Sequence, residues 1–138
     1  MPGRLTTRVL SLGESSTIDV KASDYWSDTG LELANGALYE CRADGRWLDW
    51  HITSGPDGYD ASWWPLLQPL FNRWRRMPTA RWFALCGAVQ GKETDLFLIG
   101  SRAQLRLPAG RLLCFANDLS GFYWNNSGAV TLTVERIA

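Results

Sequence analysis

Hydrophobic and polar residues alternate along short stretches of the chain, and turn-forming residues separate these stretches. Alternation with a period of two is typical of β-strands that bury one face. In residues 129–137 the pattern places Val130, Leu132 and Val134 on one face and polar residues on the other. We expect strands at residues 4–10, 16–21, 37–42, 82–90, 95–99, 103–107, 111–116 and 129–137.

The stretches between these expected strands contain glycine, asparagine, aspartate and proline in combinations that favour tight turns. They lie at residues 35–36, 44–45, 55–58, 90–92 and 108–110. Many short strands joined by such turns indicate an antiparallel arrangement. The sequence therefore predicts an all-β fold, an antiparallel β-sandwich or barrel.

Residues 62–76 interrupt the alternation. Ser62 is a suitable cap for a short helix with apolar residues at helical spacing, but Pro69 would break that helix. We expect a short helical or irregular insertion here. It is interpreted as a lid packed on the core, with a basic amphipathic docking surface as the other reading.

Length and composition limit the classes of protein to consider. A chain of 138 residues with 46% hydrophobic and 20% charged residues fits one globular domain, residues 1–138. Its 14 basic and 14 acidic residues leave no net charge to attract a phosphate backbone, so nucleic acid is not an expected partner. No apolar run reaches the roughly 20 residues of a membrane span, and no signal peptide is recognised. We expect cytoplasmic synthesis, with release by a signal-independent route left open.

The cysteines and tryptophans add two expectations. Cys41, Cys86 and Cys114 are odd in number and lack CxxC spacing, which predicts buried free thiols. Eight tryptophans are more than a core of this size accommodates, so some are expected on a binding surface. Such a surface would suit the apolar face of a sugar ring or a partner protein.

The stretch NDLSGFYWNNSG, residues 117–128, is rich in oxygen donors and poor in core-forming side chains. Asp118, Asn125 and Asn126 offer three hard oxygen ligands of the kind that calcium prefers, and the glycines at 121 and 128 allow the backbone to turn. The other reading is an Asx-rich turn that holds no metal. Zinc is not expected, because one histidine and three dispersed cysteines do not provide a tetrahedral ligand set.

The pattern N-D-x-x-G-x-Y-x-N-N-S-G, followed by AVTLTVERI, resembles the closing calcium loop of the PA-IL-like galactose-binding lectins, a family of calcium-dependent β-sandwich proteins. FALCGAV, LFLIG, PAGRLLCFAND and DGRWLDWHITSGPDG resemble other segments of that family, so the similarity covers about residues 37–137. The resemblance implies calcium ligands at the Asp118 carboxylate, the Asn125 and Asn126 side-chain oxygens, and the Phe122 and Trp50 carbonyls. Two sugar hydroxyls would complete the coordination.

The chain departs from that family after its G-P-x-G turn. The family places a histidine and a glutamine beside the sugar there, whereas this chain has YDASWWPLLQPLFNRW. Galactose is therefore a candidate ligand that the resemblance does not assure. His51, Asp57, Trp63 and Trp64 are candidate sugar contacts, and His51 is also interpreted as a local hydrogen-bonding residue.

These observations favour a calcium-dependent carbohydrate-binding, lectin-like module. With the resemblance, they predict an all-β fold, an antiparallel β-sandwich of the galactose-binding-like or jelly-roll-like kind. The alternative is an accessory module that docks to a protein through the Trp- and Arg-rich residues 62–82, with a structural or vestigial calcium site. No catalytic residues are expected, because the chain lacks GxSxG, a Gly-rich phosphate loop and a nucleophile at a suggestive spacing from His51. Unpaired sheet edges and surplus tryptophan favour a homo-oligomer.

Overall fold

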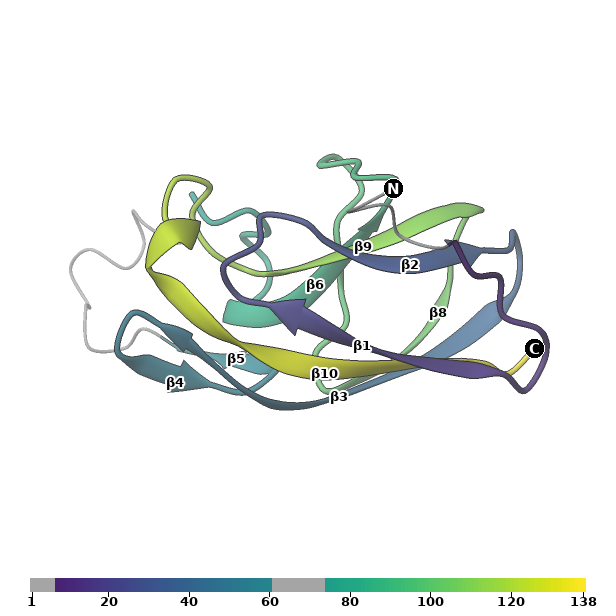
Figure 1. The fold of residues 1–138 in the computed structure, drawn as a ribbon. Coiled ribbons are helices and arrows are strands. Elements are labelled where there is room, and N and C mark those ends of the chain that lie inside the picture. The colour runs from purple at the N-terminus through teal and green to yellow at the C-terminus, as the bar shows by residue number, and fades with distance from the viewer. Residues whose placement is uncertain (1–6, 61–73) are drawn as a thin grey trace, which may run out of the picture.

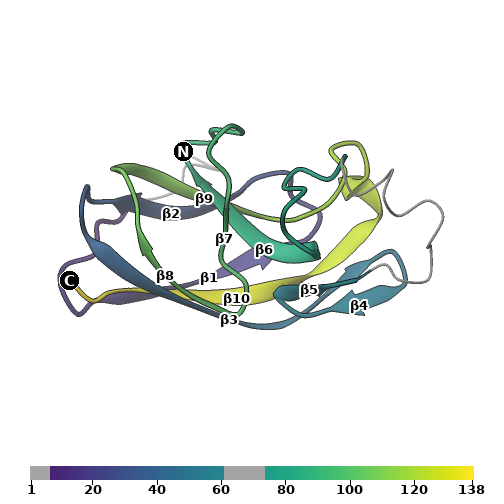
Figure 2. The same cartoon turned by 180° about the vertical axis from the view of Figure 1, so that it is seen from behind.

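The computed structural model describes residues 7–60 and 74–138, which form two antiparallel sheets packed face to face (Figures 1 and 2). One sheet has the order β1-β10-β3-β4, with β8 also pairing with β3, and the other has the order β2-β9-β6-β5, with β7 pairing with β6. The strands are β1 (Ser15–Lys21), β2 (Ser27–Leu33), β3 (Leu38–Asp49), β4 (Ile52–Ser54), β5 (Asp57–Tyr59), β6 (Trp82–Val89), β7 (Phe97–Leu98), β8 (Arg102–Arg106), β9 (Gly110–Ala116) and β10 (Asn126–Arg136).

The core lies between the inner faces of the two sheets. Val130, Leu132 and Val134 are fully buried on β10, as the alternation predicts. Trp47 of β3 is also fully buried, its ring edge-on to Phe83 with centroids 5.8 Å apart, and its Nε1–H donates to the Phe83 carbonyl at 3.1 Å. That bond satisfies the indole N–H, which is otherwise expensive to bury.

The all-β sandwich is confirmed, and most expected strands are present. Those predicted at 16–21, 37–42, 82–90, 95–99, 103–107, 111–116 and 129–137 correspond to β1, β3, β6, β7, β8, β9 and β10. The three cysteines are buried and free, as predicted.

Two predictions about the strands and turns are wrong, and three strands were missed. In the described part of residues 4–10 there is only an isolated bridge between Arg8 and Leu31. The turn expected at residues 44–45 is absent, because β3 continues through it to Asp49; Gly45, with φ of 105°, stays in register with Val130 of β10. Strands β2, β4 and β5 were not predicted. β4 and β5 have only three residues each, and the buried face of β2 includes the polar residues Ser27 and Thr29, which weakens its alternation.

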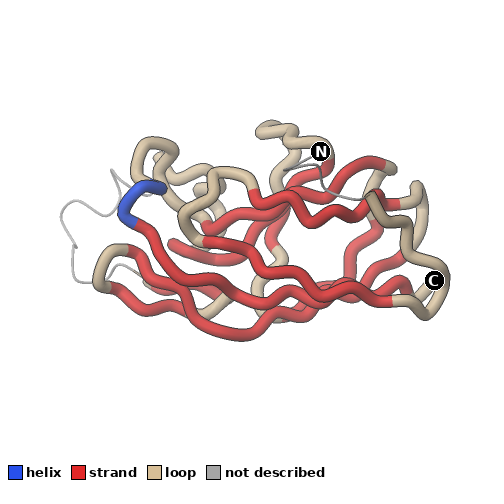
Figure 3. Tube along the Cα trace, viewed as in Figure 1, coloured by secondary structure: helices blue, strands red, loops and turns tan. Residues whose placement is uncertain are grey.

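The expected insertion at 62–76 lies mostly outside the described residues. Residues 74–76 form a turn and a bridge, in which Arg75 pairs with Leu119. Within the described chain the helical structure is one 3₁₀ turn, η1 (Tyr123–Asn125), drawn in blue in Figure 3. None of the helical structure described is long and apolar enough to span a membrane.

Candidate functional site

The oxygen-rich loop lies at one end of the sandwich, remote from the C-terminus. The loop connects β9 to β10 through η1, and Figures 1 and 2 place η1 and the β3–β4 hairpin at this same end. The pairing of β10 with β3 sets Asn126 directly opposite Asp49. Two segments far apart in the sequence therefore meet at this end.

Asp118 and Asn126 are joined by a buried hydrogen bond. Their exposed fractions are 3% and 6%. The Asn126 amide donates to Asp118 Oδ2 at 3.0 Å and to the Ala22 carbonyl at 3.1 Å, and Asp118 Oδ1 accepts the Leu119 N–H at 2.7 Å. The structure thus brings together two of the side chains expected to bind calcium.

The two amide oxygens of the loop are buried without a partner. Neither Asn125 Oδ1 nor Asn126 Oδ1 accepts a hydrogen bond from any group that the structure describes. A buried acceptor with no donor carries the full penalty of desolvation, about 1–3 kcal/mol. In an Asx-rich turn these oxygens would accept backbone N–H groups, so the arrangement fits a site that receives a cation.

The electrostatics of the site also favour a cation. The pKa of Asp118 is raised from 3.8 to about 6, chiefly by burial and secondly by the nearby charge of Asp49, although the bonds from Asn126 and Leu119 lower it. Burial likewise raises the pKa of Asp49. In the described chain neither carboxylate pairs with an arginine or lysine. Within residues 7–60 and 74–138, therefore, no ion pair balances the charge of either carboxylate.

The predicted backbone ligands, Trp50 and Phe122, are in exposed turns at this end. Trp50 and His51 form the tight turn between β3 and β4, and Trp50 has φ of 57°, an uncommon backbone conformation for a bulky residue. The Trp50 ring packs against the His51 ring at a tilt of 36°, with centroids 4.2 Å apart. Trp50, Phe122 and Trp124 are all exposed, with Trp124 at 79%. Exposed aromatic side chains therefore lie both in the polar loop and in the β3–β4 turn.

The other predicted sugar contacts are placed differently. Asp57 is exposed, and its Oδ1 accepts the Ser101 N–H at 2.7 Å, so this carboxylate ties β5 to the turn before β8. Trp63 and Trp64 lie outside the described residues.

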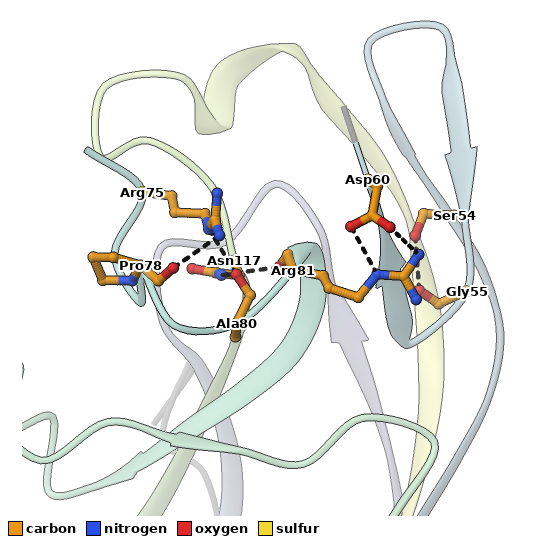
Figure 4. A network of polar contacts seen from close by, with 8 residues as sticks. All are labelled: Ser54, Gly55, Asp60, Arg75, Pro78, Ala80, Arg81 and Asn117. Carbon is orange, nitrogen blue, oxygen red and sulfur yellow. Dashed lines mark hydrogen bonds and ion pairs between the residues drawn. The ribbon is translucent and has the colours of Figure 1, made fainter. Parts of the chain in front are cut away.

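The loop is anchored by Asn117, which is completely buried beside Asp118. Asn117 Oδ1 accepts the Met77 N–H at 2.9 Å, and Nδ2 donates to the carbonyls of Met77, Ala80 and Arg81 at 2.9, 3.3 and 2.9 Å. Figure 4 shows this side chain between Arg75 and Arg81, with Arg75 donating to Pro78 and Arg81 facing Asp60. These bonds hold residues 77–81 against the start of the loop.

Arg76 provides a second anchor. Its side chain is 1% exposed, and its guanidinium lies 3.6–5.5 Å from the centroids of four rings, those of Tyr25, Trp26, Phe115 and Tyr123. It donates to the Tyr123 hydroxyl at 3.0 Å, and its backbone N–H donates to the Asp118 carbonyl at 3.0 Å. Cation–π contacts in such a desolvated setting are worth about 2 kcal/mol. The arginines at 75 and 76 are therefore used inside the fold, although the sequence places them on a possible docking surface.

Sequence reasoning missed Asp49 and Arg76. Asp49 lies between Trp47 and Trp50 and belongs to no recognisable motif. Arg76 occurs in an arginine-rich run that resembles a basic surface. The one available signal for Asp49 is its position directly before Trp50, a predicted ligand.

The donor set suits calcium better than a transition metal. The described residues contain no cluster of three His, Cys, Asp or Glu side chains. Calcium accepts amide and carbonyl oxygens as readily as carboxylates, so a site with few carboxylates and two unsatisfied amide oxygens can still hold it. The residues present therefore fit a calcium ion.

Comparison with known proteins gives one kind of match. No protein-family model matches the sequence, and no curated protein matches it. The fold is similar to a solved structure described as the EclA N-terminal domain, a PllA-like lectin, with a TM-score of 0.63 and 20% sequence identity, over 88% of this chain and 94% of that one. The chain therefore has the fold of a PA-IL-like lectin, and the resemblance inferred from its loop motif is confirmed at the level of the fold.

Proposed function

We propose that this protein is a calcium-dependent carbohydrate-binding domain. The observation that carries the proposal is the pair of buried, unpartnered amide oxygens of Asn125 and Asn126 beside the buried carboxylate of Asp118. A lectin fold with such a donor set at the end of its sheets supports the same reading.

Each residue has a defined part in the proposal. The Asp118 carboxylate and the oxygens of Asn125 and Asn126 would hold calcium, with the backbone carbonyls of Phe122 and Trp50. Bound calcium supplies coordination positions that two vicinal sugar hydroxyls can take from water. The Asn126 amide, fixed by Ala22 and Asp118, orients the carboxylate.

The exposed aromatic side chains suit the apolar face of a sugar. Trp124 is 79% exposed and Trp50 is 67% exposed, and both belong to the turns that carry the proposed ligands. An indole face beside the ion would exclude water from one side of a bound ring. Galactose is the first sugar to test, because the loop motif resembles that of galactose-binding lectins.

Calorimetric titration of the chelator-treated protein with calcium tests the metal, and a glycan array run with and without calcium tests the sugar. We expect heat on calcium addition, a higher melting temperature and array signals that EDTA abolishes. Calcium at 100 times its Kd would stabilise the native state by about 2.7 kcal/mol. An Asp118→Asn variant should lose these effects.

Asp44→Asn serves as the matched control, because Asp44 is exposed on β3 outside the proposed site. This variant should titrate like the parent protein. Titrations without heat or thermal shift in the parent protein would refute the calcium site. Array signals that survive EDTA would refute the calcium dependence of sugar binding.

A further inference from the structure

Asp49 lies at the end of β3, where the chain turns into the β3–β4 hairpin. Its backbone partner across the sheet is Asn126, the first residue of β10. Its side chain is half-buried. Neither the loop motif nor the fold similarity gives this residue a role, although its charge acts on Asp118.

One oxygen of the Asp49 carboxylate is fixed and the other is available. The Tyr59 hydroxyl donates to Oδ2 at 2.5 Å, across the short strands β4 and β5. Oδ1 accepts no hydrogen bond from the described residues. The tyrosine therefore holds the carboxylate in one orientation and leaves an oxygen free for another ligand.

The carboxylates of Asp49 and Asp118 repel each other, and neither forms an ion pair with a basic side chain among the described residues. Two negative charges in partly buried positions are unfavourable unless a positive charge is held between them. The unpartnered oxygen of Asn126, a residue that is only 6% exposed, belongs to the same site. This second observation points to a site that receives a cation and not to a chance cluster of acids.

We propose that Asp49 is a second carboxylate of the cation site, held in position by Tyr59. The inference rests on the proposed function, because it concerns the same calcium ion. With Asp118 and Asp49 both ionised, a divalent ion is neutralised by its protein ligands. The open coordination positions then carry no excess positive charge, which favours neutral vicinal hydroxyls over acidic sugars.

The competing explanation is that Asp49 serves only as a hydrogen-bond acceptor for Tyr59. An asparagine would accept the same bond without a buried charge, so Asp49→Asn separates the two roles. This substitution preserves side-chain shape and removes one negative charge. Tyr59→Phe removes the hydroxyl and retains the charge, which tests the positioning role.

The experiment is a calorimetric titration with calcium and a terbium luminescence titration excited through nearby tryptophan, on the full chain at 0.15 M salt. We expect Asp49→Asn to weaken calcium binding about tenfold or more, and Tyr59→Phe to weaken it less. Terbium carries one more positive charge than calcium. Loss of a carboxylate should therefore reduce terbium affinity by a larger factor, which a purely structural role would not do.

Asp44→Asn is the control for a general loss of negative charge. Asp44 is exposed on the same strand, five residues and about 17 Å from Asp49. That separation exceeds the Debye length of about 8 Å at this salt concentration, so both metals should bind as in the parent protein. Urea denaturation in EDTA checks that each variant is folded.

The outcomes distinguish the two proposals. Weaker calcium binding by Asp49→Asn, with a lower ratio of terbium to calcium affinity, supports the inference. Unchanged binding of both metals refutes the role of Asp49 and leaves the proposed function standing. Absence of calcium binding in the parent protein overturns both.

Discussion

Two buried asparagines border the same loop and differ in how fully they are hydrogen-bonded. Asn117, at its start, uses both its carbonyl and its amide in bonds to residues 77–81. Asn126, at its end, uses only its amide, and its Oδ1 is left unpartnered. Burial alone therefore does not separate an asparagine that supports the fold from one that is suited to a ligand.

The difference shows that one end of the loop stabilises the fold, whereas the other end carries polar groups suited to binding a ligand. The residues around Asn117 and Arg76 are rigidly connected, and Arg76 joins residues 25–26, β9 and η1 through its aromatic contacts. This rigid side supports a polar cluster whose own bonds are incomplete. A preorganised site of this kind loses little conformational entropy when it binds an ion.

Asn117→Ala is expected to have the largest effect on stability. It leaves the buried Met77 N–H without its acceptor, and it removes one of the two hydrogen bonds that each of the Met77, Ala80 and Arg81 carbonyls accepts. We expect the free energy of unfolding to fall by about 3 kcal/mol, measured by urea denaturation in EDTA. A loss below about 1 kcal/mol would contradict the anchoring role of Asn117.

A change of pH in the absence of calcium is expected to have the second largest effect on stability. The pKa of Asp118 is raised from 3.8 to about 6, so between these values the native state holds a proton that the unfolded state has released. Stability is therefore greatest at low pH and falls as pH rises through 6. From this group we expect about 1.4 kcal/mol more stability at pH 5 than at pH 8.

Urea denaturation in EDTA from pH 5 to pH 8 measures this trend. Asp118→Asn is the control, because it cannot titrate and should have a flatter profile. Saturating calcium should reverse the trend, since protons compete with the ion for Asp118. A stability that rises from pH 5 to pH 8 in EDTA would contradict the burial of an uncompensated carboxylate.

Asn126→Ala is expected to have the smallest effect on stability in EDTA. The substitution removes two hydrogen bonds but also removes one unsatisfied buried oxygen, so the net loss should be about 1 kcal/mol. The same variant should lose the stabilisation by calcium. Comparison with Asn117→Ala, whose calcium response should persist wherever the variant is folded, separates the ligand from the anchor. If Asn126→Ala destabilised the protein as much as Asn117→Ala does, the proposed difference between a ligand residue and an anchor residue would be contradicted.

The sequence by itself determined the elements whose signals are local. Alternation along residues 129–137 predicts which side of β10 is buried, and Val130, Leu132 and Val134 lie in the core. The spacing of Asp118, Asn125 and Asn126 on one loop identifies oxygen donors that the structure places at one end of the sandwich. Such patterns are readable because strands have a period of two and loop residues are close in sequence.

The tertiary structure alone decided what depends on pairing between distant segments. The continuation of β3 through residues 44–45 follows from its register with β10, and the same register brings Asp49 opposite Asn126. The burial of Arg76 follows from rings contributed by three separate parts of the chain. These features were not predictable because strand register and the packing of distant side chains depend on the whole fold. Local sequence propensity does not specify them.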